Sequence, residues 1–205
     1  MPRKKEYIPS VMVGQSRYQV LFPTLDREVQ EKVLQIMSDK LSENPEYCDA
    51  GNYQHLCNIM SAAGIYLALI DAGKSREDAF QIVSTAMWDY VEKTMAPTYR
   101  KLFRLPGMLK IMGKLLPKMF QKGSGYGWRY VWHLEEATNS HLRFECHQCI
   151  YAPLFAKFGI PELGPMFCHV DDINFGRIKG LQFKREHTLC KDGKPCDFLF
   201  ERISG

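Results

Sequence analysis

The sequence predicts an α+β protein in which an N-terminal helical layer packs on a C-terminal antiparallel sheet with inserted short helices. Two observations carry this prediction. Apolar residues recur at helical spacing through most of residues 1–127, whereas much of residues 128–205 alternates between apolar and polar side chains. We therefore expect a helical portion over residues 1–127 and a sheet portion over residues 128–205, joined in one continuous domain.

The first two helices have clear boundary signals. After a short extended segment at residues 18–22, Thr24 is a favourable N-cap for the first helix and Pro45 marks its end. The second helix is expected over residues 53–72, with Gly73 as its C-terminal cap. A short turn then follows, so the second helix and the next one should pack as an antiparallel pair.

Ser75 opens the third helix in a capping arrangement, and Pro97 is expected to end it. His55 and Cys57 lie on the second helix, where a half-buried helix side explains both without any chemistry, because free cysteine behaves as a small hydrophobic residue. The start of the chain, residues 1–5, is basic and is expected to be loose.

Residues 93–129 differ from the rest of the chain in charge, because they contain nine basic residues and no Asp or Glu. Lysines recur every four residues beside a helical apolar stripe, and Pro117 is expected to kink or shorten this helix. Three interpretations stay open: a solvated helix face, a membrane-surface or partner-binding helix over residues 107–122, and a cationic lid over an anionic substrate. The three glycines in residues 123–127 indicate a flexible hinge.

The sheet portion is expected to contain four strands and two short helices. The strands are expected at residues 128–135, 141–147, 179–189 and 196–203. The helices are expected at residues 150–158 and 162–171, with Gly159 ending the first of them.

Composition narrows the class of protein. The net charge of +4 is too small to indicate a nucleic-acid partner, and the longest apolar stretch, residues 62–70, is much shorter than the roughly 20 residues that a membrane span requires. Seven cysteines, an odd number, without an apolar leader at the start indicate reduced thiols. We therefore expect a cytoplasmic protein with no transmembrane segment.

Five of the seven cysteines lie within residues 144–200, a density typical of a nucleophilic or metal site. Cys146 and Cys149 form a CxxC motif, which serves zinc, iron–sulfur clusters and dithiol redox chemistry. A structural zinc site usually pairs two such motifs and the sequence has one, so we favour no metal or cofactor. If zinc or an iron–sulfur cluster is bound, the expected ligands are Cys146, Cys149, Cys168 and Cys196.

Cys168 and Asp171 are the first candidates for catalysis. On a helix over residues 162–171 they share a face at i, i+3. A carboxylate raises the pKa of a neighbouring thiol, so activation of Cys168 requires a cation or an imidazole, which His187 or His147 would supply. The competing interpretation is that Cys168 is buried packing and that Asp171 is a helix-end carboxylate.

The strand expected at residues 179–189 places Arg185 and His187 on the same side as its apolar residues, as in a strand that leaves the core and enters a pocket. The guanidinium of Arg185 suits a substrate carboxylate. A surface ion pair with Glu186 or Glu201 is the competing interpretation of this arginine.

Together these motifs resemble the L-2-amino-thiazoline-4-carboxylic acid hydrolase family. The matching residues are Cys149-x-Tyr151, Gly159-x-Pro161-Glu162-Leu163, Cys168-x-x-Asp171, Arg185-x-x-Thr188-Leu189 and Gly193-x-x-Cys196-Asp197-Phe198. Residues 66–69 also resemble the helical half of the family. The sequence departs from the family pattern at two positions, because Cys146 creates the CxxC motif and Cys190 adds a thiol.

The resemblance implies hydrolytic opening of a cyclic amidine or isothiourea, such as 2-amino-thiazoline-4-carboxylate, to a carbamoyl-cysteine, with a small anionic molecule as substrate. The roles that we expect are Cys168 as nucleophile, Asp171 as general acid/base, His187 as imidazole partner, Arg185, Thr188 and Tyr151 as substrate-binding residues, residues 93–129 as cationic cover, and Cys149 and Cys196 as pocket residues or substitute nucleophiles. The alternative is a non-enzymatic or redox thiol-lined module that binds a small molecule, a metal or a cofactor.

Overall fold

The computed structural model describes residues 7–203, so the basic start expected to be loose lies outside the described residues. Its helices are α1 (Pro9–Gly14), α2 (Arg27–Ser42), α3 (Tyr53–Asp71), α4 (Arg76–Tyr90), α5 (Ala96–Phe103), α6 (Met108–Gly123), α7 (Tyr151–Lys157) and α8 (Leu163–Phe175). Its strands are β1 (Arg129–Trp132), β2 (His141–Gln148), β3 (Leu181–Lys184) and β4 (Cys196–Arg202). Single helical turns form η1 (Phe22–Thr24), η2 (Pro45–Tyr47), η3 (Val91–Met95) and η4 (Leu134–Glu136). The predicted α+β class is confirmed.

The helical layer is built around α3, which is buried on nearly every side. The helix α2 packs closely on it because Gly64 has no side chain: a Cβ atom there would lie 3.0 Å from the carbonyl oxygen of Val33. The chain leaves α3 through Gly73, whose φ is +90°. Ser75 then caps α4 by accepting a hydrogen bond from the backbone N–H of Asp78 at 3.0 Å, as the sequence predicted.

Four local predictions were wrong. Thr24 is not the N-cap of α2, because it lies in η1 and Asp26 occupies that position. Residues 18–22 form turns that lead into η1 and are not extended. Pro97 does not end the helical path, because the chain passes through η3 into α5, whose first turn holds the proline; a missing N–H costs nothing there. The residues expected to form a hinge are anchored, because the backbone N–H of Tyr126 donates to Asp49 at 2.7 Å and Asn52 donates to the carbonyl oxygen of Tyr126 at 2.9 Å.

The sheet has the strand order β1-β2-β4-β3, and each neighbouring pair is antiparallel. In the register of β2 with β4, three inward-facing pairs follow one another along the strands: Cys146 with Cys196, Phe144 with Phe198, and Leu142 with Phe200. The strand β3 is shorter than predicted, so the chain after Lys184 leaves the sheet and carries Arg185 away from it.

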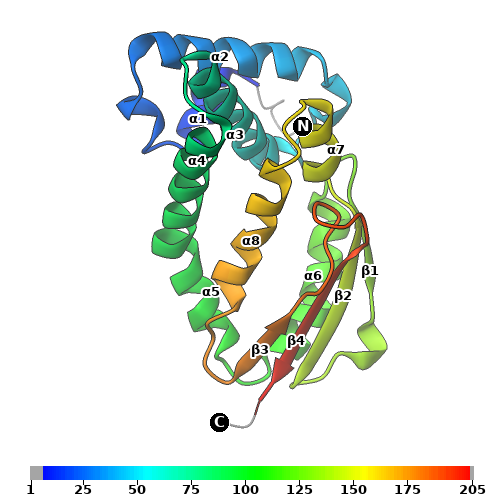
Figure 1. Ribbon diagram of the computed structural model, residues 1–205. Coiled ribbons are helices and arrows are strands. Elements are labelled where there is room, and N and C mark those ends of the chain that lie inside the picture. Colours follow the sequence, from blue (N-terminus) through cyan, green and yellow to red (C-terminus); the bar gives the residue numbers. More distant parts are fainter. Residues whose placement is uncertain (1–6, 204–205) are drawn as a thin grey trace.

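The helix α8 joins the two halves of the molecule (Figure 1). Its residues Met166 and Val170 pack in the helical core, and Phe175 packs in a second apolar cluster between the sheet, α5 and α6. Within residues 7–203, no helix has both the length and the apolar character needed to span a membrane.

Candidate functional site

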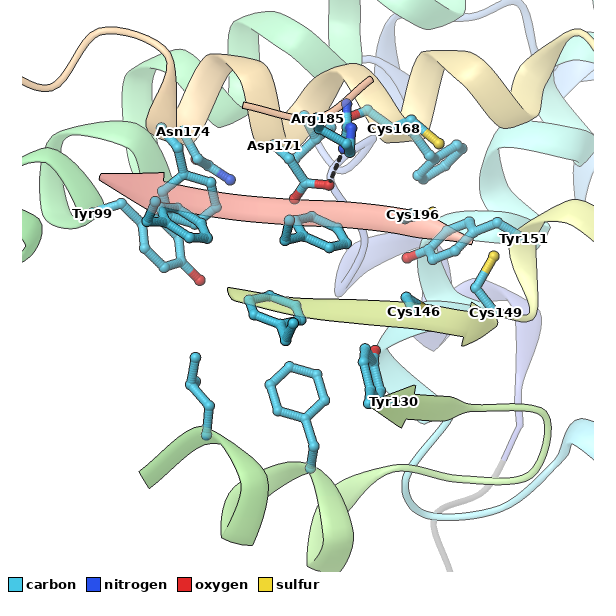
Figure 2. A pocket seen from close by; sticks show the side chains of 18 of the residues that line it. Tyr99, Tyr130, Cys146, Cys149, Tyr151, Cys168, Asp171, Asn174, Arg185 and Cys196 are labelled. Carbon is cyan, nitrogen blue, oxygen red and sulfur yellow. Dashed lines mark hydrogen bonds and ion pairs between the residues drawn. The ribbon is translucent and has the colours of Figure 1, made fainter. Parts of the chain in front are cut away.

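A cavity of about 340 Å³ lies between α8 and the inner face of the sheet, with α5 and α6 closing it on another side. Figure 2 shows that its cysteines gather towards one end, which we call the polar end, where Cys149, Cys146 and Cys196 lie beside Tyr151. Towards the other end the labelled side chains are Tyr99 and Asn174. The cavity is therefore elongated along the strands and has two chemically different ends.

Three thiols interact at the polar end. Cys190, on the loop before β4, forms side-chain hydrogen bonds with both Cys149 and Cys168. These bonds are the largest cause that lowers the pKa of each partner; the pKa of Cys149 falls to about 7, although burial opposes the shift. The pKa of Cys190 is raised, because it supplies the proton.

Cys149 and Cys168 receive further support from different neighbours. The backbone N–H groups of Tyr151 and Ala152, at the start of α7, donate to the sulfur of Cys149 and lower its pKa. For Cys168, the side chain of Thr188 and the positive charge of Arg185 lower the pKa. Cys149 is thus the thiol whose ionisation is best supported at neutral pH.

The other two cysteines of the cavity are different. Burial raises the pKa of Cys146, whose thiol donates to the carbonyl oxygen of Gln148 at 3.1 Å. Burial also raises the pKa of Cys196 to about 12. These thiols stay protonated at neutral pH, so Cys196 is not a substitute nucleophile and the CxxC motif does not act as a pair of thiolates.

The thiols are also not arranged as a metal site. Among the described residues, no three of the four expected ligands Cys146, Cys149, Cys168 and Cys196 have sulfur atoms within 4.8 Å of one another. The groups that do lie that close are His133 with Glu135 and Glu136, and Glu186 with His187 and Asp197.

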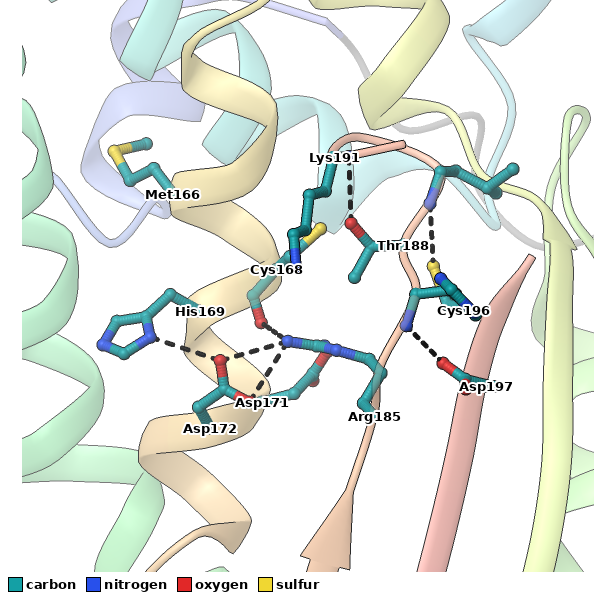
Figure 3. A network of polar contacts seen from close by, with 12 residues as sticks. Met166, Cys168, His169, Asp171, Asp172, Arg185, Thr188, Lys191, Cys196 and Asp197 are labelled. Atoms are coloured by element: carbon teal, nitrogen blue, oxygen red, sulfur yellow. Dashed lines mark hydrogen bonds and ion pairs between the residues drawn. The ribbon is translucent and has the colours of Figure 1, made fainter. Parts of the chain in front are cut away.

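Asp171 and Arg185 form an ion pair (Figure 3) that lies in the middle of the cavity (Figure 2). Arg185 Nη1 donates to Asp171 at 2.7 Å, and Nη2 donates to the backbone oxygen of Cys168 at 2.9 Å and to Asp172 at 3.1 Å. Arg185 Nε has no hydrogen-bond partner within the described part of the chain. Asp171, Asp172 and the backbone oxygen of Cys168 already occupy Nη1 and Nη2, so the expectation that Arg185 binds the substrate carboxylate does not fit this arrangement.

Burial dominates the pKa of Asp171 and raises it to about 6, while the charge of Arg185 acts in the opposite direction. A carboxyl group with this pKa exchanges a proton near neutral pH, which is what a general acid/base must do. The expected acid/base residue therefore lies in the cavity with suitable protonation chemistry.

His187 lies outside the residues that line the cavity. Its Nδ1 is 2.6 Å from Asp192, and its backbone N–H donates to Asp197 at 2.7 Å. The chain leaves the sheet before this residue, so the alternation that placed Arg185 and His187 on one side does not hold there. His187 is thus not positioned as the imidazole partner of Cys168.

The histidine that does line the cavity is His55, on α3. Burial lowers its pKa to about 4, so the ring is neutral, and Nδ1 lies 2.9 Å from the hydroxyl of Tyr151. Sequence reasoning had treated His55 as an ordinary helix residue, because its neighbour Tyr151 is 96 positions away.

Arg17 is a second lining residue that sequence reasoning missed. Its positive charge lowers the pKa of Asp171 and of Tyr151, which places the guanidinium near the polar end. The side-chain contact that the structure gives it is Nη1 to the sulfur of Met87 at 3.5 Å, and none of the described carboxylates forms an ion pair with it. Arg17 is thus the cation with free capacity for an anionic substrate.

The basic segment covers the cavity with its apolar face. Met112, Leu116 and Phe120 of α6 line the cavity, whereas Lys110, Lys114 and Lys118 are exposed to solvent. The described lining contains no lysine. Residues of the 93–129 segment do cover the cavity, but the expectation that the cover is cationic is wrong. The cover is apolar.

Comparison with known proteins gives one family. A family model described as L-2-amino-thiazoline-4-carboxylic acid hydrolase matches residues 57–200. No curated protein and no solved structure matches the chain. The matched residues include every thiol of the cavity as well as Asp171 and Arg185, whereas Arg17 and His55 lie before them.

Proposed function

Since the chain belongs to the L-2-amino-thiazoline-4-carboxylic acid hydrolase family, we propose that it hydrolyses a cyclic isothiourea such as 2-amino-thiazoline-4-carboxylate to a carbamoyl-cysteine. The observation that carries this proposal is the polar end of the cavity. There, Cys149 with a pKa of about 7 and Asp171 with a pKa of about 6 line one enclosed space. A nucleophile and a proton donor are the two groups that this reaction needs.

In the first step, the Cys149 thiolate adds to the carbon between the ring sulfur and the ring nitrogen. The ring carbon–sulfur bond then breaks, and the leaving sulfur takes the proton of the Asp171 carboxyl group. The enzyme now carries the opened substrate through a carbon–sulfur bond, and every atom of the substrate is retained. Cys149 replaces Cys168 as the proposed nucleophile, because two backbone N–H groups and Cys190 stabilise its thiolate.

In the second step, water adds to the same carbon. Asp171, now a carboxylate, accepts one proton from this water, the former ring nitrogen takes the other, and the bond to Cys149 breaks to restore the thiolate. The product is a urea attached to cysteine, so the atoms balance with one water and no oxidant or reductant is required.

Arg17 is the proposed partner of the substrate carboxylate. Arg185 has a different role, because its bonds to Asp171, Asp172 and the backbone of Cys168 position α8 and the acid/base residue. The neutral His55 holds the hydroxyl of Tyr151 at the polar end, where this hydroxyl can donate to the substrate.

The test is a turnover assay with L-2-amino-thiazoline-4-carboxylate, followed by intact-protein mass spectrometry. The native protein should form carbamoyl-cysteine, and rapid quenching should reveal protein whose mass has increased by one whole substrate. Cys149→Ala should lose both the product and the adduct. Cys48→Ala is the matched control, because Cys48 does not line the cavity.

Two results would contradict this account. If Cys149→Ala turns over at the native rate while Cys168→Ala is inactive, the nucleophile is Cys168. If the native protein binds the thiazoline and releases no carbamoyl product, the thiol group formed with Cys190 belongs to a redox or ligand-binding module and hydrolysis is excluded.

A further inference from the structure

We propose that the natural substrate carries an apolar group, at least the size of an aromatic ring, which occupies the end of the cavity away from the thiols. This inference rests on the proposed function, because it places the reacting ring at the polar end. The unsubstituted thiazoline carboxylate would then be the reactive head of a larger substrate and would leave the other end of the cavity unfilled.

The inner face of the sheet grades from thiols to hydrocarbon along the strands. Cys146 stands beside Cys196 at one end, while the next pair, Phe144 and Phe198, stacks with ring centroids 4.7 Å apart and 9° between the planes. The third pair continues the apolar surface as far as Phe200. A ligand aligned with the strands therefore meets thiols first and an aromatic surface after them.

The helix α8 carries polar groups along the cavity and adds an aromatic ring, Phe175, at the end away from the thiols. Cys168 lines the polar end, Asp171 follows one turn later, and Asn174 and Phe175 line the cavity another turn on. Figure 2 shows Asn174 far from the cysteines. The end away from the thiols is thus bordered by phenylalanines from two opposing walls and by one amide, Asn174.

Asn174 provides an independent sign of a ligand at this end. The residue is 4% exposed, and its Oδ1 lacks a hydrogen-bond partner among residues 7–203. A buried amide oxygen without a partner costs free energy, so such atoms usually have a reason. A ligand that reaches this end with a hydrogen-bond donor would satisfy the oxygen.

The volume of the cavity also indicates a substrate larger than the thiazoline carboxylate. Protein interiors are close-packed and have few voids larger than a water molecule, so a cavity of about 340 Å³ is not ordinary packing slack. Cavities of roughly 300–1,000 Å³ hold drug-sized ligands. The thiazoline carboxylate is one small ring with an amine and a carboxylate, so it accounts for the polar end alone.

The first experiment measures binding of carboxylates with growing apolar tails by isothermal titration calorimetry. The probes are acetate, phenylacetate, 4-phenylbutyrate and 6-phenylhexanoate. Each buried methylene should increase affinity about two- to fourfold, because the cavity removes it from water. Affinity that does not change along the series would overturn the proposal.

The second experiment measures kcat/KM for the unsubstituted thiazoline and for its 5-benzyl and N-benzyl derivatives. At least one derivative should exceed the unsubstituted ring about tenfold. Met112→Trp, which fills the apolar end from α6, should reduce that ratio at least tenfold. The control is Ile111→Trp, because Ile111 is the preceding residue on α6, is exposed and does not line the cavity. Leu116→Phe is a milder filling variant if Met112→Trp fails to fold.

The outcomes separate the two proposals. If the unsubstituted ring is hydrolysed while the benzyl derivatives are poorer and affinity does not grow with tail length, the apolar group is excluded and the hydrolase stands. If no thiazoline is hydrolysed while affinity grows along the tail series, the hydrolase fails and the amphipathic ligand stands.

Discussion

The two ends of the cavity are built from the same elements and differ in what those elements carry. At one end, β2, β4 and α8 contribute cysteines; at the other, the same elements contribute Phe144, Phe198, Phe200 and Phe175. Burial at the polar end shifts protonation, because it raises the pKa of Asp171 to about 6. Burial at the apolar end creates a surface for hydrocarbon beside the amide of Asn174. Reaction and recognition are therefore separated along one axis, and each can be changed without the other.

The largest expected effect comes from removing the acid/base group at the polar end. Asp171→Asn keeps the shape of the side chain but cannot exchange a proton, so kcat should fall about 10²–10⁴-fold. Steady-state assays on 2-amino-thiazoline-4-carboxylate measure this directly. Asp172→Asn is the control, because Asp172 also binds Arg185 but does not line the cavity. Equal losses in the two variants would show that Asp171 acts only through Arg185.

The next largest effect is expected at Arg17, the proposed partner of the substrate carboxylate. Arg17→Gln should increase KM about 10–100-fold with little change in kcat, because a hydrogen bond to a charged group is lost in the bound substrate and in the transition state alike. Arg27→Gln is the control, since Arg27 is exposed and pairs with Glu31 on α2. If Arg17→Gln instead lowers kcat with KM unchanged, Arg17 acts on the reacting atoms.

The pH dependence of kcat/KM comes third. The free enzyme needs the Cys149 thiolate and the protonated Asp171, so the rate should fall about tenfold per pH unit below about 6 and above about 7. In Asp171→Asn, the fall in kcat/KM above about pH 7 should disappear, because that fall follows deprotonation of the carboxyl group. A profile that stays level from about pH 6 to about pH 8.5 would place the ionisation of Cys149 near the ordinary value for a thiol.

The smallest effect comes from Cys190, the thiol shared by Cys149 and Cys168. Cys190→Ala removes the hydrogen-bond donor that Cys149 shares with Cys168, so the pKa of Cys149 should rise. At pH 7 the rate should fall about three- to tenfold, because less thiolate is present, and the loss relative to the native protein should shrink as the pH is raised. A loss that is the same at every pH would assign Cys190 a packing role against Gly164, whose Cα faces its side chain.

The fold could be predicted from the sequence where the signals are local. Ser75, Gly73 and Gly159 lie at helix ends as expected, because capping and positive φ depend on neighbouring residues. Pro97 misled for a local reason too, because a proline that can end a helix can also occupy its first turn.

The site was predictable only in part. Spacing on α8 identified Cys168 and Asp171, but it could not reveal Arg17 and His55, whose roles depend on tertiary contacts with residues far along the chain. His187 was assigned by strand alternation, and that pattern stopped where β3 ends at Lys184. The apolar end was hidden as well, because phenylalanines that line a cavity alternate along a strand in the same way as phenylalanines that fill a core.

The central claim is that the polar end of the cavity ionises Cys149, and the rate of its alkylation by iodoacetamide across pH 5–10, followed on the Cys149 peptide by mass spectrometry, tests it most directly. The account predicts a midpoint near pH 7 and slower labelling when the thiazoline carboxylate is present. A midpoint of about 8.5 or above, with no protection by the thiazoline, would contradict it.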